Sequence, residues 1–168
     1  MNILATSAIA ITAVFASAWG AGQFVDRNLH TQIIIDAPAS EVWDQLADIK
    51  SYSSWNPFIK QFSGILKAGE TINVTIQPDG GSAMTFTPLV LKAAQNKELR
   101  WIGKLGFKGV FDGEHYFIIS QTADGKTLFK HGENFSGMLA PLLLAMIADD
   151  TLKGFKSMNE ALKKQVEA

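Results

Sequence analysis

The chain has 168 residues, with 15 Lys and Arg against 16 Asp and Glu and a formal net charge of −1. This length suits one domain of ordinary size plus a short segment, and the balanced charge gives no electrostatic footprint for nucleic acid. The absence of cysteine excludes disulfides, thiolate zinc sites and thiol nucleophiles.

The N-terminus carries a long uncharged segment, residues 3–25. About 20 apolar residues span a bilayer, so this segment is long enough to be a membrane anchor. A secretory signal is the second interpretation, because residues 16–18 (Ala-Ser-Ala) offer a cleavage site, although the basic start is missing. A buried core helix is the third, and the absence of a polar face at helical spacing disfavours it.

We therefore predict that residues 1–25 are a hydrophobic helix acting as a signal peptide or membrane anchor. Residues 26–32 would then be a tether. This organisation favours the inner membrane or the periplasm of a bacterium, with a membrane contact through residues 3–25 if the segment is not cleaved.

The first elements of the remaining chain are a strand and two short helices. Residues 31–36 form a β-branched run that predicts a strand. Pro38 suits a first helical turn, so we expect a helix from there to about Ala47. Residues 51–55 predict a helical turn that Asn56-Pro57 ends, because the residue before proline avoids the helical region.

A series of strands follows. Alternation at Ile72, Val74 and Ile76 indicates one buried face, and Gly-containing turns separate the segments. We predict strands over residues 58–66, 71–77, 83–94, 98–105, 109–121 and 126–135. Pro88 indicates an edge or a bulge within the strand 83–94.

The last element is a long helix beginning near Pro141. Apolar residues recur along it at spacings of four and three, which is the pattern of a continuous buried seam: Leu144, Ala148, Thr151, Phe155, Met158 and Leu162. Antiparallel strands followed by one long helix predict an α+β fold. We expect a curved antiparallel sheet wrapped on this helix, in a domain of residues 33–165.

Several segments carry a resemblance to a known family: residues 35–38 with Val42-Trp43, residues 55–58 (Trp-Asn-Pro-Phe), 99–101, 113–117 and 131–137. In their order and spacing the chain resembles the START-like, Bet v 1-like (SRPBCC) superfamily, in its polyketide cyclase/dehydrase-type branch. The resemblance covers roughly residues 31–165. It implies a helix-grip fold with a hydrophobic ligand cavity, and it implies function much less.

Two histidines and a carboxylate are predicted to point into the interior. His115 shares a strand face with Phe117, and His131 and Glu133 share a face with Phe129. Burial would push all three pKa values toward the neutral forms, the setting of acid–base chemistry. The alternative is a structural polar network. We expect no metal site, since no short-spaced histidine motif is present, and no cofactor.

Ordinary core packing is the alternative role for the aromatic wall residues. The predicted ligand-binding residues are Trp55, Phe58, Phe86, Trp101, Phe111, His115, Phe117, Phe129, His131, Glu133, Leu142 and Met146. Residues 104–109 are expected to form a loop at the cavity mouth. Residues 139–147 are apolar on all sides and would form a cavity lid or touch a membrane.

The favoured function is binding or carriage of a hydrophobic small molecule, lipid or polyketide-like, in an enclosed cavity. One alternative is a cyclase or dehydratase that uses His115, His131 and Glu133. The other is a membrane-tethered interaction domain. The sequence leaves the ligand and the oligomeric state open.

Overall fold

The computed structural model describes residues 27–168. The hydrophobic segment at residues 3–25 lies outside the described residues, so its role as signal peptide or anchor stays a prediction. Within residues 27–168, no helix is both long and apolar enough to cross a membrane.

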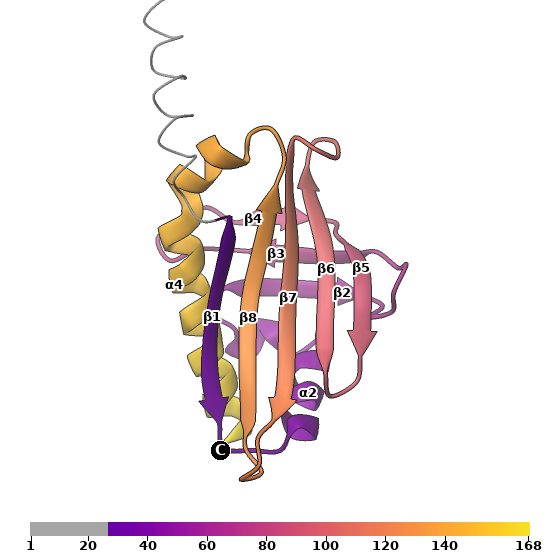
Figure 1. Cartoon of the computed structure of the whole chain (residues 1–168), viewed down its shortest axis with the longest axis vertical. Helices are drawn as coiled ribbons and strands as arrows, with labels where there is room; N and C mark the ends of the chain where they lie inside the picture. Colours follow the sequence, from indigo (N-terminus) through magenta and orange to yellow (C-terminus); the bar gives the residue numbers. More distant parts are fainter. Residues whose placement is uncertain (1–26) are drawn as a thin grey trace, which may run out of the picture.

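A large antiparallel sheet forms one layer of the domain, and helix α4 (Ala140–Val166) lies along it (Figure 1). The strand order is β1-β8-β7-β6-β5, so the first strand pairs with the last. Their bounds are Asn28–Ile35 for β1, Leu89–Ala94 for β5, Glu98–Leu105 for β6, Phe111–Gln121 for β7 and Thr127–Ser136 for β8. The predicted α+β helix-grip architecture is confirmed.

A second, three-stranded sheet contains β2 (Ile59–Gly64), β3 (Ile72–Ile76) and β4 (Met84–Phe86), and its strands run across the large sheet in Figure 1. The single strand predicted over 83–94 is therefore wrong. The chain leaves β4 and enters β5 at Pro88, whose carbonyl accepts a hydrogen bond from Ile72 N at 3.0 Å. Proline has no N–H to donate to a ladder, which is why it marks the place where the chain changes sheets.

Strand β1 begins earlier than the sequence suggested. The predicted tether over 26–32 is wrong for residues 28–32, because Asn28 already pairs with Asn134 of β8. Leu29 is buried while His30 is exposed, as expected for an edge strand with one inner face. Asn28, His30 and Gln32 belong to the exposed face of this strand, whereas Thr31 shares the inner face with Leu29.

The Trp-Asn-Pro-Phe segment connects the short helices to β2. Helix α2 spans Ala39–Ala47 and α3 spans Tyr52–Trp55. The Asn56 side-chain oxygen accepts hydrogen bonds from the backbone N–H groups of Phe58 (2.9 Å) and Ile59 (2.8 Å). This turn directs the Phe58 ring onto α4 at Gly154, where there is no side chain in its way.

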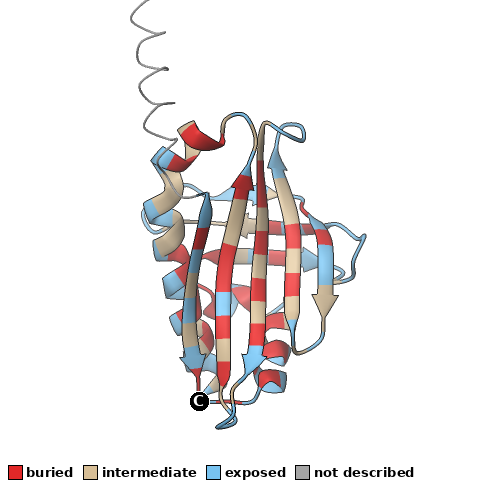
Figure 2. Cartoon of the chain, viewed as in Figure 1, coloured by how far each residue is buried: buried red, intermediate tan, exposed pale blue. Residues whose placement is uncertain are grey.

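The predicted apolar seam of α4 is confirmed, since Leu144, Phe155, Met158 and Leu162 are buried. Buried residues alternate with less buried ones along β7 and part of β8 (Figure 2). The core lies between this face of the large sheet and α4.

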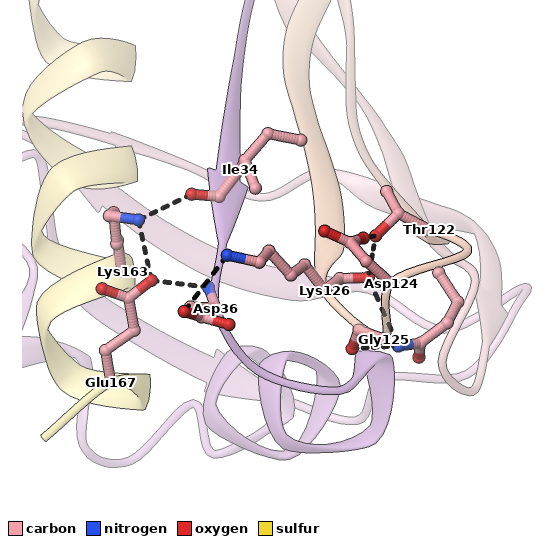
Figure 3. Close-up of polar contacts among 9 residues, drawn as sticks. Ile34, Asp36, Thr122, Asp124, Gly125, Lys126, Lys163 and Glu167 are labelled. Carbon is pink, nitrogen blue, oxygen red and sulfur yellow. Dashed lines mark hydrogen bonds and ion pairs between the residues drawn. The ribbon is translucent and has the colours of Figure 1, made fainter.

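Polar contacts tie the C-terminal end of α4 to β1 (Figure 3). Lys163 Nζ donates to the carbonyl of Ile34 at 2.7 Å and to Glu167 Oε1 at 2.7 Å. The same Glu167 oxygen accepts from Asp36 N at 2.6 Å, and Lys126 pairs with Asp36 at 3.2 Å. At this end of the domain, hydrogen bonds and ion pairs of charged side chains hold the last turn of α4 against the end of β1.

We predict that Gly154→Ala destabilises the protein, although alanine favours a helix over glycine by about 1 kcal/mol. The added Cβ would overlap the Phe58 ring, and overpacking costs typically about 1–3 kcal/mol. Urea unfolding followed by circular dichroism should show a lower midpoint.

Lys156→Ala, an exposed change in the same helix, is the matched control and should leave the midpoint nearly unchanged. The double variant Gly154→Ala with Phe58→Leu should lose less free energy of unfolding than the two single variants lose in sum, because both substitutions alter the same contact. A higher midpoint for Gly154→Ala would contradict the packing described.

Candidate functional site

The interior contains two adjacent buried histidines, His115 on β7 and His131 on β8. Trp101 of β6 stacks on the His115 ring at 4.6 Å with an interplanar angle of 6°. Phe155 of α4 stacks on the His131 ring at 4.0 Å. Aromatic rings therefore cover both imidazoles and exclude water from them.

A continuous row of hydrogen bonds passes through these histidines. Asn159 Nδ2 donates to Thr31 Oγ1 at 2.8 Å, and Asn159 Oδ1 lies 2.9 Å from His131 Nδ1. His131 Nε2 lies 3.1 Å from His115 Nε2, and His115 Nδ1 lies 3.3 Å from Glu133 Oε2. We call Thr31, Asn159, His131, His115 and Glu133 the polar chain. It joins β1, α4, β8 and β7.

The hydrogen-bond partners set the direction of the polar chain. Thr31 Oγ1 donates to the His131 carbonyl (3.4 Å) and accepts from Asn159 Nδ2, so the Asn159 oxygen faces His131. A neutral His131 must then carry its proton on Nδ1, which leaves Nε2 as an acceptor.

The same reasoning continues to the far end. A neutral His115 donates through Nε2 to His131 and accepts at Nδ1. The partner of His115 Nδ1 is Glu133 Oε2, so this carboxyl must supply the proton. Every hydrogen bond of the polar chain is satisfied when Glu133 is a carboxylic acid and both histidines are neutral.

The electrostatics favour the same protonation state. Burial lowers the pKa of His115 to about 3, and burial together with the neighbouring His115 lowers the pKa of His131 well below its usual value. Burial raises the pKa of Glu133 to about 8. At neutral pH the polar chain is uncharged, which is the form that an apolar interior tolerates.

The two ends of the polar chain reach different surroundings. The Glu133 side chain keeps 20% of its surface exposed, and the missing side chain at Gly113 leaves room for its carboxyl group. At the other end, Thr31 and Asn159 line a hollow of about 170 Å³ between β1 and α4, together with Gln32, Ile33, Lys156 and Glu160.

A second hollow, of about 370 Å³, lies between α2 and the end of α4, and its lining is mostly polar: Glu41, Asp44, Gln45, Asp48, Gln165 and Val166. Neither hollow lies among the aromatic side chains that separate the large sheet from α4. The enclosed cavity expected from the sequence is not one of these two hollows. A ligand that contacts the two imidazoles must displace the rings that cover them.

Most of the predicted ligand-binding residues converge on this interior. Phe58 and His131 both contact Phe155, at 5.9 and 4.0 Å between ring centroids, and Trp101 and Phe117 flank His115. Phe129 stacks on Phe117.

The other predicted residues lie elsewhere. Trp55 packs on Tyr52 within α3, at a part of the core away from the histidines, and Phe86 is half-buried on the small sheet. Phe111 is half-buried against Phe135, and Leu142 is half-buried at the start of α4. Met146 is 72% exposed, which places it outside the interior.

Two members of the polar chain, Thr31 and Asn159, were not predicted from the sequence. Asn159 follows Phe155 by four residues, so it shares the inner face of α4. A polar residue at that position beside the apolar seam is the signal that would have identified it. Thr31 could not be recognised, because its role depends on the pairing of β1 with β8.

Residues 26–167 match the model of a protein family described as polyketide cyclase/dehydrase and lipid transport. No curated protein matches the chain.

Solved structures share the fold at low identity. A START superfamily protein from Mycobacterium smegmatis is 20% identical, with a TM-score of 0.65 over 83% of this chain and 97% of that one. The Zhui aromatase/cyclase from Streptomyces sp. R1128 is 16% identical, with a TM-score of 0.62 over 83% and 93%. Protein MLL2253 from Mesorhizobium loti is 18% identical, with a TM-score of 0.63 over 83% and 96%.

We predict that Glu133→Gln changes the pH dependence of stability between about pH 6.5 and 8. The native state holds the Glu133 proton up to about pH 8, whereas the unfolded chain releases it above about pH 4.3. The contribution of Glu133 to the free energy of unfolding therefore decreases as the pH rises through this range. Glutamine keeps a donor for His115 and does not titrate, so the variant should lack this decline.

The buried histidines act in the opposite direction. Their folded pKa values are depressed, so their contribution is present above about pH 6.5 and is lost as the pH falls below it. This acid-side loss should persist in Glu133→Gln. Urea unfolding at a series of pH values measures both effects, and parallel profiles for the two proteins above pH 6.5 would contradict a protonated Glu133.

Proposed function

Because the chain belongs to the polyketide cyclase/dehydrase and lipid transport family, we propose that it binds a hydrophobic small molecule carrying one polar group, between the large sheet and α4. The resemblance to the START-like superfamily is confirmed by this match and by the fold. The observation that supports the proposal is Glu133, a partly exposed carboxyl group at the end of an otherwise buried polar chain.

The chemistry of this interior suits such a ligand. Trp101, Phe117 and Phe155 supply apolar surface, which favours burial of hydrocarbon. The polar chain is uncharged at neutral pH, so an apolar ligand beside it does not desolvate a charge. The second Glu133 oxygen remains as an acceptor for a ligand hydroxyl, while the protonated oxygen stays with His115.

Access to the buried histidines requires movement, because aromatic rings cover both imidazoles. The start of α4 is the element suited to it, since Leu142, Leu143 and Ile147 there are only half-buried. The opposite end of α4 is tied to β1 through Lys163 and Glu167. We infer that ligand entry separates the first turns of α4 from the sheet, while its last turns stay in place.

Acid catalysis is a second candidate, favoured by the proton that the geometry places on Glu133. A carboxylic acid with a pKa near 8 can protonate a departing hydroxyl group at neutral pH once its O–H turns from His115 toward the ligand. The reaction this would assist is the loss of water from a bound hydroxylated ligand: the C–O bond breaks, the hydroxyl leaves as water with the Glu133 proton, and the resulting carboxylate accepts the proton from the adjacent carbon as the double bond forms. Acid catalysis predicts that the ligand is dehydrated, and that Glu133→Gln abolishes this reaction while it retains binding. A carrier would release its ligand unchanged.

We predict that the protein prefers a long-chain alcohol to the matching hydrocarbon. The probes are a fluorescent conjugated polyene alcohol and the same polyene without the hydroxyl. One neutral hydrogen bond contributes about 1 kcal/mol, or about fivefold in affinity. Glu133→Leu should remove this preference, and Glu133→Gln should retain most of it.

Lys130→Leu is the matched control, because Lys130 lies exposed on the same strand. It adds apolar surface without touching the interior and should bind both probes as the native protein does. The proposal fails if the native protein binds neither probe, or if Glu133→Leu keeps the full preference.

A further inference from the structure

Three large apolar side chains are exposed together at one end of the domain. Leu105 is 50% exposed, Phe107 72% and Met138 62%. We call these residues the apolar tip. Single exposed apolar residues are ordinary on a soluble surface, but a group of them marks an interaction site.

Backbone hydrogen bonds hold the apolar tip together. Met138 N donates to the Gly109 carbonyl at 2.9 Å, and Leu139 N donates to the Val110 carbonyl at 2.8 Å. The connection from β6 to β7 is thereby fixed to the connection from β8 to α4, and both lie at one end of the sheet in Figure 1. The position of the apolar tip is therefore fixed by hydrogen bonds between these two connections.

The described chain begins at this same end. Phe135 N donates to the Arg27 carbonyl at 2.8 Å, and Asn28 pairs with Asn134. Strand β8 ends one residue after Phe135, at Ser136, which lies opposite Asp112. The uncharged residues 3–25 therefore join the domain at the end that carries the apolar tip.

Positive charges flank the exposed apolar residues. Lys104 and Lys108 are both exposed and lie on either side of Leu105 and Phe107. Asp112, the acidic residue nearest to Lys108 in sequence and opposite Lys104 in the β6–β7 pair, is buried, and its Oδ2 accepts a hydrogen bond from Gly109 N at 2.8 Å. Exposed apolar side chains between lysines suit the boundary between anionic headgroups and acyl chains.

We propose that the apolar tip inserts into the surface of a lipid bilayer that contains anionic lipids. The bilayer is favoured over a protein partner because the hydrophobic N-terminal segment enters at this end and the flanking charges are basic. The opposite end, with the turn at residues 122–126 and the contacts of Figure 3, would then point away from the membrane. This surface is separate from the interior and does not depend on the proposed ligand.

The absence of cysteine permits a direct test in the full chain. Phe107→Cys carries a single polarity-sensitive nitrobenzoxadiazole label at the tip. Ala123→Cys, an exposed position in the turn at the opposite end, carries the same label as the matched control. Each protein is reconstituted into vesicles of phosphatidylcholine alone or with phosphatidylglycerol, with or without a lipid-borne spin-label quencher.

The proposal predicts a blue-shifted and lipid-quenched label at residue 107, with stronger quenching in the anionic vesicles, and an unquenched label at residue 123. Lys104→Gln with Lys108→Gln should reduce the quenching at residue 107 in anionic vesicles only. Equal quenching at both positions, or none at residue 107, overturns the proposal. A blue shift at residue 107 that needs no lipid and grows with protein concentration would instead identify a second copy of the chain as the partner.

Discussion

His131 is the residue on which the interior depends, because it joins the sheet to the long helix in two ways. Its ring stacks on Phe155, and its Nδ1 is paired with Asn159, four residues further along α4. Its Nε2 is paired with His115 on the next strand. A charge at this position would be deeply buried, so the packing of α4 on the sheet requires a neutral imidazole.

This requirement passes along the hydrogen bonds to Glu133. A neutral His131 fixes the proton of His115, and His115 in turn requires a proton donor at its Nδ1. Among residues 27–168, the titratable group paired with His115 Nδ1 is Glu133, whose burial favours its acid form. The packing of α4 on His131 thus sets the protonation of a carboxyl group two residues further along β8. We propose that this carboxyl is the member of the polar chain that meets a ligand.

Much of this arrangement could be predicted from the sequence. Alternation along the strands identified His115, His131 and Glu133 as inward residues, and the spacing of Leu144 to Leu162 identified the buried face of α4. The division of residues 83–94 between two sheets could not be predicted, because it depends on the hydrogen bond between Ile72 and Pro88. Thr31 was placed where the predicted tether (26–32) and the predicted first strand (31–36) overlap, because polar residues on an edge strand resemble a linker until their pairing is known.

The expected cavity shows a different limit. Periodicity indicates which side chains face inward, but it does not indicate how their rings pack. Here Phe155, Trp101 and Phe117 lie against the two imidazoles, and the two hollows described above lie beside α4 and not among these rings. The proposed ligand site lies beneath the rings, next to the half-buried start of α4, and in this proposal the polar group at Glu133 gives it chemical selectivity.

The most direct test of this account is nitrogen NMR of the histidine side chains across a pH series. The account predicts that His131 carries its proton on Nδ1 and His115 on Nε2, and that neither titrates between about pH 5 and 8, where a free histidine would. The opposite tautomers, or a titration of either ring near its ordinary pKa, would contradict it.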